Sequence, residues 1–285
     1  MLDIIPQIKT AIFLMMMGLL LASIATVFIL ISFTKFDEMT VAQIGLLIGE
    51  LFLPIPIIIW GRRSRTDLKQ FFRLNPVSRS SLFAALPLAL GLTILTDEMD
   101  RIAQMILPVP YEFSKIKDMM TISDPLSAVF IIGVVILVAP FIEELIFRGF
   151  FQRILEYRYK DITKAVLLSA LAFAVIHFNP WWIVQIYIIG IFMGYVAWRT
   201  NSIWISFIIH AVNNGISVWF SQQPEEALYW YEWRGHVAPF MLMIGIFLLI
   251  AGIRWFINVT PVVQKNENAV LIEDLFSVPP SQSRQ

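Results

Sequence analysis

Long apolar stretches separated by shorter polar segments run through the chain. Residues 10–33 contain no charged residue over 24 positions, which exceeds the roughly 20 residues that a helix needs to cross a bilayer. Seven further stretches have the same character, so the pattern predicts about eight transmembrane helices. These stretches are 39–60, 80–96, 126–147, 163–177, 181–198, 203–220 and 237–257.

The polar segments predict how these helices are organised. Residues 97–125 predict a loop, part of which is expected along the membrane interface because apolar side chains stand among acids. The tail from residue 261 is polar and Ser/Gln-rich at its end, and we expect it to be mobile. The predicted fold is an all-α polytopic membrane protein. Residues 1–260 form a single bundle with a polar intramembrane cavity, and residues 261–285 form a C-terminal tail.

Composition agrees with a membrane protein and excludes several other classes. Apolar residues make up 58% of the 285 positions and charged residues 15%, whereas soluble domains carry about 45–50% and 25%. Lysine plus arginine equals aspartate plus glutamate at 21 each, so no basic excess points to nucleic acid. The sequence contains no cysteine, which excludes disulfides, cysteine-ligated zinc and iron–sulfur clusters.

Basic residues concentrate in two polar segments. Residues 61–80 hold five arginines and one lysine, and residues 148–164 hold three arginines and two lysines. The positive-inside rule places both segments in the cytoplasm. With eight spans, both termini are then cytoplasmic, and we expect an integral protein of the cell membrane.

Two adjacent carboxylates lie within the predicted span 126–147. Glu143 and Glu144 must point in different directions, because neighbouring helical residues are about 100° apart. Glu144 and Arg148 are four residues apart, which predicts an ion pair and leaves Glu143 free for chemistry. Pro140 removes a backbone hydrogen bond and predicts a bend in the helix. The alternative is that the charged residues form a solvated helix end.

Two of the three histidines also lie in predicted spans. His177 ends the span 163–177, and His210 shares a helical face with Asn214, four residues later. Each histidine alone is more often a core residue than a catalyst, but polar groups on three spans each need a partner inside the bilayer. One shared cavity satisfies all of them. His236 lies in an outer loop and is assigned no role.

Depth sets a condition on this shared cavity. If the inner membrane edge lies at Arg148 and at the start of 163–177, a rise of 1.5 Å per residue puts Glu143 roughly 8–10 Å deep and His177 about 21 Å deep. The two side chains then meet only if the span 163–177 begins later or tilts steeply.

These residues form motifs that resemble a known family. Glu-Glu-x-x-x-Arg at 143–148, Phe-x-x-x-His at 173–177 and His-x-x-x-Asn at 210–214 occur in this order on successive apolar stretches. They are similar to the motifs of the CAAX-protease and bacteriocin-processing (CPBP) family of intramembrane endopeptidases. That family includes type II CAAX prenyl proteases and lysostaphin-resistance-like proteins. The resemblance covers about residues 125–220, the catalytic core that it implies.

The resemblance implies hydrolysis of peptide bonds in membrane-associated protein or peptide substrates. It implies that Glu143 is the general base that activates water and that His177 orients this water and helps to deprotonate it. His210 and Asn214 would stabilise the oxyanion, which needs donors aimed where negative charge develops. The supporting residues would be Glu144, Arg148 and Phe173.

A metal site is the alternative chemistry. Two histidines and a glutamate form many catalytic zinc sites, so Glu143, His177 and His210 could hold zinc. Glu144 would then have to be the base, although helix geometry points it elsewhere and Arg148 competes for it. The metal-free glutamate mechanism, without a cofactor, is therefore favoured, and zinc stays open.

Two functions of another class also stay open. A proton-coupled transporter would use the same side chains as a relay, although the sequence shows no internal repeat with paired broken helices. A non-catalytic scaffold or immunity protein would keep the site without turnover. Gly190 and Gly194 suit helix–helix association, either between chains or within the bundle.

Overall fold

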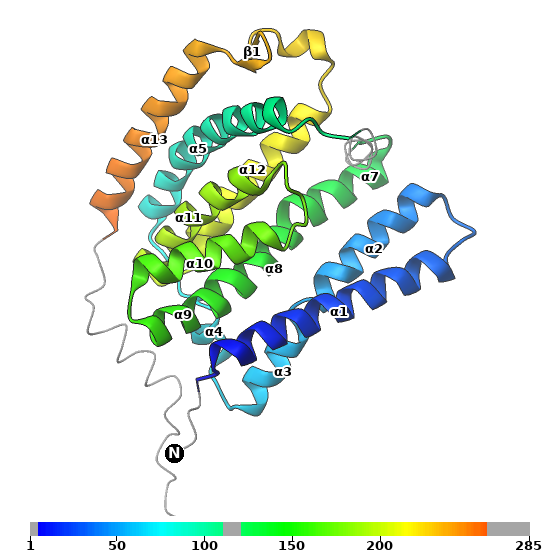
Figure 1. Ribbon diagram of the computed structural model, residues 1–285, viewed down its shortest axis with the longest axis vertical. Helices are drawn as coiled ribbons and strands as arrows, with labels where there is room; N and C mark the ends of the chain where they lie inside the picture. Colours follow the sequence, from blue (N-terminus) through cyan, green and yellow to red (C-terminus); the bar gives the residue numbers. More distant parts are fainter. Residues whose placement is uncertain (1–4, 111–120, 261–285) are drawn as a thin grey trace, which may run out of the picture.

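The computed structural model describes residues 5–110 and 121–260, and these are almost entirely helical (Figure 1). The helices of the first part are α1 (Ile8–Ser32), α2 (Glu38–Phe52), α3 (Ile55–Arg63), α4 (Leu68–Phe71) and α5 (Arg79–Ile106). Those of the second part are α7 (Pro125–Phe130), η1 (Ile131–Val138), α8 (Ala139–Glu144), η2 (Leu145–Phe151), α9 (Gln152–Tyr159), α10 (Ile162–Val175), α11 (Ile183–Thr200), α12 (Trp204–Ser221), η3 (Glu225–Leu228) and α13 (Pro239–Val259). One short hairpin, β1 (Glu232–Trp233) and β2 (His236–Val237), precedes α13.

Six helical stretches in the described part of the chain are long and apolar enough to cross a membrane. They are Ile8–Ser32, Met39–Arg63, Arg79–Ile106, Pro125–Tyr159, Ile183–Thr200 and Pro239–Val259. The other two predicted spans are also helical: α10 is shorter, and α12 carries the polar residues of the third motif. The predicted all-α polytopic membrane fold is confirmed, and the number of eight spans stays a prediction.

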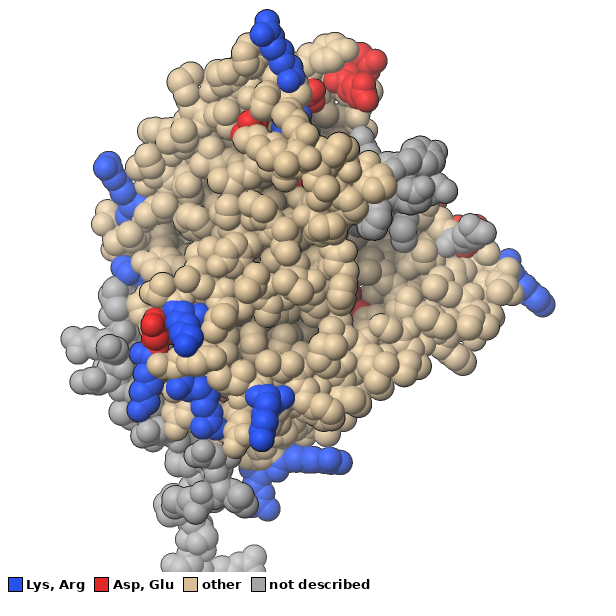
Figure 2. Space-filling model, viewed as in Figure 1, with Lys and Arg blue, Asp and Glu red and all other residues tan. Residues whose placement is uncertain are grey.

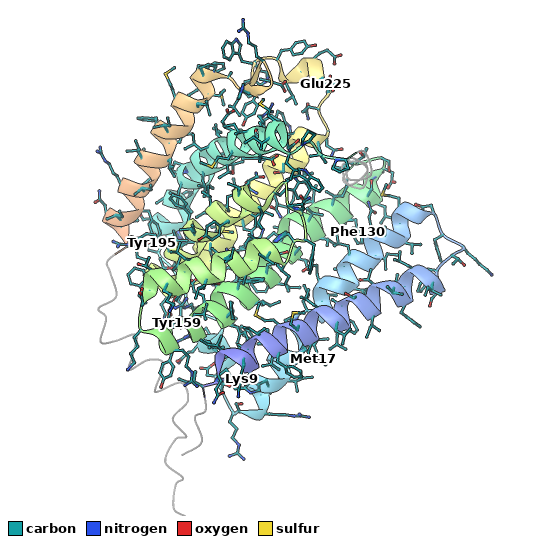
Figure 3. The ribbon with its side chains drawn as sticks, viewed as in Figure 1. Lys9, Met17, Phe130, Tyr159, Tyr195 and Glu225 are labelled. Carbon is teal, nitrogen blue, oxygen red and sulfur yellow. The ribbon has the colours of Figure 1, made fainter. Side chains whose placement is uncertain are left out.

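Charged side chains gather at the two ends of the molecule. On the face shown in Figure 2, most lysines and arginines lie at the end that carries Lys9 and Tyr159 in Figure 3, and most acids lie towards Glu225. The surface between the ends is largely uncharged. Ile31 of α1 and Phe247 of α13 are both 70% exposed. Such a continuous apolar surface is suited to lipid rather than to water.

α5 is longer than the sequence predicted. It continues ten residues beyond Thr96 to Ile106, because residues 97–106 contain no proline or glycine and Arg101 pairs with Asp97, one turn earlier, at 3.0 Å. The first part of the expected loop 97–125 is therefore helix. Residues 111–120 of that loop lie outside the described residues, as does the tail 261–285.

The β-hairpin packs on the C-terminal end of α5. His236 Nδ1 lies 2.8 Å from Glu98 Oε1, and the backbone amide of Val237 donates to Glu98 Oε2 at 2.8 Å. Tyr231 donates its hydroxyl hydrogen to Asp97 at 3.0 Å. Burial and the nearby carboxylate raise the pKa of Tyr231, so its phenol stays a donor at neutral pH. His236, which had no predicted role, thus helps to fix the hairpin.

The helical stretch Pro125–Tyr159 carries both glutamates and runs through α7, η1, α8, η2 and α9 without interruption. The helix continues for twelve residues beyond the predicted end of this span at residue 147. Both η segments are π-helical, with wider turns that often occur at functional sites. Pro140 is the second residue of α8, two positions after the end of η1, so the missing amide hydrogen bond is accommodated close to a π-helical segment within a continuous helix.

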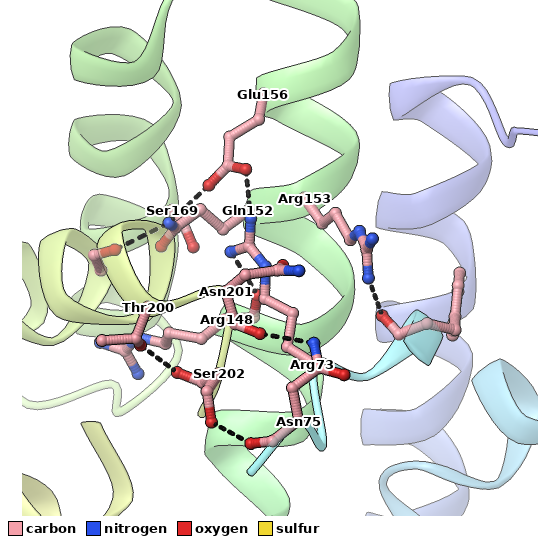
Figure 4. A network of polar contacts seen from close by, with 12 residues as sticks. Arg73, Asn75, Arg148, Gln152, Arg153, Glu156, Ser169, Thr200, Asn201 and Ser202 are labelled. Atoms are coloured by element: carbon pink, nitrogen blue, oxygen red, sulfur yellow. Dashed lines mark hydrogen bonds and ion pairs between the residues drawn. The ribbon is translucent and has the colours of Figure 1, made fainter. Parts of the chain in front are cut away.

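A buried polar network holds the extension of this helix in place (Figure 4). Arg73, between α4 and α5, forms an ion pair with Glu156 and donates to the carbonyl of Arg148 at 3.2 Å. Gln152 donates from Nε2 to Glu156 at 2.8 Å and to the carbonyl of Gly194 at 2.9 Å. Residues that the sequence assigned to a cytoplasmic loop are therefore part of the packed bundle.

Gly190 and Gly194 of α11 face neighbouring helices inside the bundle. A Cβ on Gly190 would lie 3.1 Å from Ala170 Cβ, and one on Gly194 would lie 2.7 Å from Gln152 Oε1. The small residues therefore allow close approach within one chain.

Candidate active site

Glu143 and Glu144 diverge from α8 as helix geometry requires. Glu144 is completely buried, and its Oε1 lies 2.6 Å from Nη1 of Arg148, whose side chain is also buried. Arg148 donates further, from Nη2 to the carbonyl of Gly190 at 3.3 Å. Glu143 faces another direction, and 19% of its side chain remains exposed. One carboxylate is thus held by an ion pair, whereas the other stays accessible.

His210 of α12 lies between the two carboxylates. Its Nδ1 is 3.2 Å from Glu144 Oε1, and its Nε2 is 3.6 Å from Glu143 Oε2. The second distance is longer than a hydrogen bond. The imidazole therefore connects the buried ion pair to the accessible carboxylate without closing off the latter.

A cavity of about 210 Å³ lies beside Glu143. Most of its wall is apolar, and its polar lining comes from two carboxylates and one imidazole. The lining residues are Met15, Leu19, Glu50, Leu53, Glu143, Ile146, Phe147, Ile176 and His177. Glu143 and His177 thus face one common space, as a shared site requires.

The length of the helix explains why Glu143 and His177 meet. The chain reverses at Lys160, which has a left-handed backbone (φ 54°) between α9 and α10. Glu143 lies 17 residues before Lys160, and His177 lies 17 residues after it. The two positions are therefore equally far along the chain from the reversal, and they line one cavity. The mismatch in depth followed from a membrane edge assumed at Arg148; the helix continues to Tyr159, and Glu143 and His177 share one cavity.

Phe173 packs against both histidines. Its ring centroid lies 4.9 Å from that of His177 and 5.6 Å from that of His210, with near-perpendicular planes in both cases. Arg148 covers the ring, with its Cζ 4.2 Å from the centroid. A cation over an aromatic face and edge-on ring contacts are both attractive. Phe173 therefore positions three polar side chains at once.

The hydrogen bond of His177 defines which ring nitrogen is available. His177 lies in the turn after α10, and its Nδ1 is 2.7 Å from the carbonyl oxygen of Phe173. A carbonyl oxygen only accepts, so Nδ1 carries the proton. In the neutral ring, Nε2 is then an acceptor that can receive a hydrogen bond from water.

Asn214 lies one turn after His210 on α12 but contacts a different element. Its Nδ2 donates to the carbonyl of Val135 in η1 at 3.0 Å. This bond uses one of its two amide hydrogens. The structure therefore places Glu143 in one cavity with His177 and 3.6 Å from His210, and leaves Asn214 at the contact between α12 and η1.

The described residues contain no group of three or more His, Asp or Glu side chains arranged to hold a metal ion. In the proposed zinc set, Nδ1 of His177 is bonded to a backbone carbonyl and Nδ1 of His210 lies next to Glu144, so Nε2 of each ring is the nitrogen left for a ligand. Metal-ligating histidines are commonly held in this way, and zinc stays open as the alternative chemistry.

A comparison with known proteins finds a match for the part of the chain that contains the predicted motifs. Residues 125–216 match the family model described as type II CAAX prenyl endopeptidase Rce1-like. Residues 125–216 are Rce1-like. The match agrees with the resemblance to the CPBP family, and the Rce1-like segment contains Glu143, His177, His210 and Asn214. No curated protein and no solved structure matches the chain.

Glu50 lines the same cavity but lies outside the Rce1-like segment, and the sequence reasoning missed it. It belongs to α2, and its Oε2 is buried without a hydrogen-bond partner among the described residues. A signal was present, because Glu50 is the one ionisable residue in the apolar stretch 39–60. A carboxylate in such a stretch is costly unless it has a function or a partner.

Proposed function

We propose that this protein is an intramembrane endopeptidase that hydrolyses peptide bonds of membrane-associated proteins or peptides with a water activated by Glu143. The similarity of residues 125–216 to a family of membrane endopeptidases supports the reaction class. The observation that carries the proposal is the common cavity of Glu143 and His177, with Glu144 already occupied by Arg148.

The chemistry begins with a water molecule between Glu143 and His177. Glu143 takes a proton from this water, His177 Nε2 accepts a hydrogen bond that orients it, and the oxygen attacks the carbonyl carbon of the scissile bond. Glu143 then passes the proton to the leaving nitrogen as the carbon–nitrogen bond breaks. A general base of this kind contributes about 100- to 10,000-fold in rate.

The tetrahedral intermediate carries a negative oxygen that needs donors. Because the Glu144 carboxylate takes the hydrogen on Nδ1, His210 donates from Nε2 only as the imidazolium. In that form Nε2, at 3.6 Å from Glu143 Oε2, is within reach of a carbonyl bound beside Glu143. Asn214 would contribute the amide hydrogen that Val135 does not use. Donors positioned in this way act mainly in the transition state, so they lower the barrier more than they tighten substrate binding.

The location follows from the charge pattern. The exposed arginines and lysines between α3 and α5, and those at the α9–α10 turn, lie in segments that we place in the cytoplasm. Both termini are then cytoplasmic, in the cell membrane. A substrate would approach as a membrane-bound protein or peptide.

Glu143→Gln provides the direct test. The change keeps the shape of the side chain but removes the base, so we expect cleavage to be abolished while the folded yield stays near that of the unaltered protein. The assay measures cleavage of internally quenched membrane peptides by purified protein in detergent. Glu225→Gln, which removes an exposed carboxylate from the outer end, is the matched control and should cleave normally. Undiminished cleavage by folded Glu143→Gln protein would refute the proposal.

A further inference from the structure

Glu50 is a carboxylate without a partner in a largely apolar cavity. At the start of the same helix, the side chain of Asp37 accepts a hydrogen bond from the backbone amide of Thr40. Glu50 Oε2, in contrast, is buried and has no hydrogen-bond partner among the described residues. An unpaired buried charge is among the least favourable arrangements in a protein interior. Such a group is expected at a site where a bound molecule supplies the partner that the free protein does not contain.

The charge next to Glu50 indicates what that partner is. Glu143 lines the same cavity and interacts electrostatically with Glu50. Two carboxylates in one apolar space repel each other and attract a cation. Within the described residues, the cavity wall contains no lysine or arginine. The positive charge must therefore come from the molecule that enters.

The shape of the cavity favours a long side chain over a small ion. Its walls include Met15, Leu19 and Leu53, which offer apolar contact. Lysine and arginine combine a long apolar stem with a charged end, and they bury the stem while the end finds a polar partner. The cavity volume of about 210 Å³ equals the volume of several water molecules of about 30 Å³ each. The cavity therefore accommodates one such stem.

We propose that this cavity binds a basic side chain of the substrate, lysine or arginine, and that Glu50 is the counter-charge that selects it. This inference rests on the proposed protease function and specifies its substrate class. Glu50 is a specificity residue rather than a catalytic one, because Glu143 must keep its own carboxylate free for water. The selective acid is contributed by α2, outside the segment that matches the family.

The test compares peptides that differ at one position. A scan places lysine, arginine, norleucine, glutamine or glutamate at each position around the cleaved bond, and kcat/KM is measured for each. We expect the unaltered protein to prefer lysine or arginine over norleucine at one position by roughly 10- to 100-fold, as for a buried charge pair. Glu50→Gln should remove this preference while norleucine peptides are still cleaved. Glu50→Asp should retain part of it, and Glu225→Gln should leave it unchanged.

Glu50→Lys provides a second, independent test, because its lysine should make the protein prefer the peptide that has glutamate at that same position. Binding of the lysine and norleucine peptides to Glu143→Gln protein tests selection without turnover and should show the same preference. Equal loss of cleavage for all peptides in folded Glu50→Gln protein would overturn the inference and make Glu50 part of the catalytic machinery. Cleavage without any basic preference would overturn the inference alone, whereas failure to cleave any peptide would overturn the protease function as well.

Discussion

At the residue scale, the two adjacent glutamates have opposite environments. Glu144 is enclosed with Arg148 and His210, while Glu143 reaches the cavity. A buried ion pair need not stabilise a protein, but removing one of its members leaves a bare charge where water cannot reach it. The energetic role of Arg148 is therefore to neutralise Glu144.

Arg148→Met should lower the free energy of unfolding by about 3–5 kcal/mol, because Glu144 then loses its counter-charge. Adding Glu144→Gln to Arg148→Met should recover part of this loss, since both charges are then gone. Thermal denaturation and folded yield in detergent measure the effect. If the double variant is less stable than Arg148→Met alone, neutralisation of Glu144 is not what Arg148 provides.

At the element scale, the closest backbone approach of α5 and α13 depends on glycine. A Cβ on Gly91 would lie 2.4 Å from the amide nitrogen of Leu249, and a Cβ on Gly252 would lie 2.5 Å from that of Leu88. These neighbours are backbone atoms, which cannot rotate away. The two helices therefore tolerate no side chain at either glycine.

Gly91→Ala should destabilise the bundle by about 1–3 kcal/mol, because the helices must separate to admit the methyl group. Gly133→Ala is the matched control: a Cβ there has nothing within 4 Å, so the change should be neutral or slightly stabilising. Denaturation temperatures of the two single variants make the comparison. Equal temperatures would show that α5 and α13 adjust more easily than their backbone contact implies.

The α9–α10 hairpin shows what sequence patterning could and could not predict. The motifs predicted that Glu143 and His177 share a site, and the spacing predicted the ion pair of Glu144 with Arg148. The pattern could not place the helix end at Tyr159, because charged and polar residues recur among the apolar ones after Phe147. They are buried only because distant partners such as Arg73 satisfy them, and such partners are not visible in a local pattern.

Glu50 was missed for a related reason. Its apolar surroundings in the sequence predicted a span, but its approach to the cavity depends on how α2 packs beside α8. The motifs that indicated a function all lie in residues 125–216, so attention to them left the N-terminal helices without a role. A carboxylate in an apolar stretch needs a structure before its partner can be named.

At the scale of the whole molecule, the two charged ends define an orientation in the membrane. The chain has no native cysteine, so single cysteines report on each end separately. Gln70, between α3 and α5, and Glu225, in η3, are both exposed and lie in segments predicted to be on opposite sides.

Gln70→Cys should react with a membrane-impermeant maleimide only after the cell membrane is opened, because the positive-inside rule predicts that its basic segment is cytoplasmic. Glu225→Cys should react in intact cells. The cysteine-free protein supplies the background for both. Labelling of Gln70→Cys from outside would invert the proposed topology.

The cavity is assembled from parts of the chain that are made at different times. Its wall contains Glu50 from α2 and His177 from the turn after α10, which are 127 residues apart. At a synthesis rate of about 5–20 residues per second, about 6–25 s separate the appearance of the two. Glu143 lies 34 residues before His177, so for about the last 2–7 s of this interval the chain carries Glu143 without the imidazole that shares its cavity. In the proposed reaction, a nascent chain would therefore be unable to cleave its neighbours in the membrane until its last cavity wall had been synthesised.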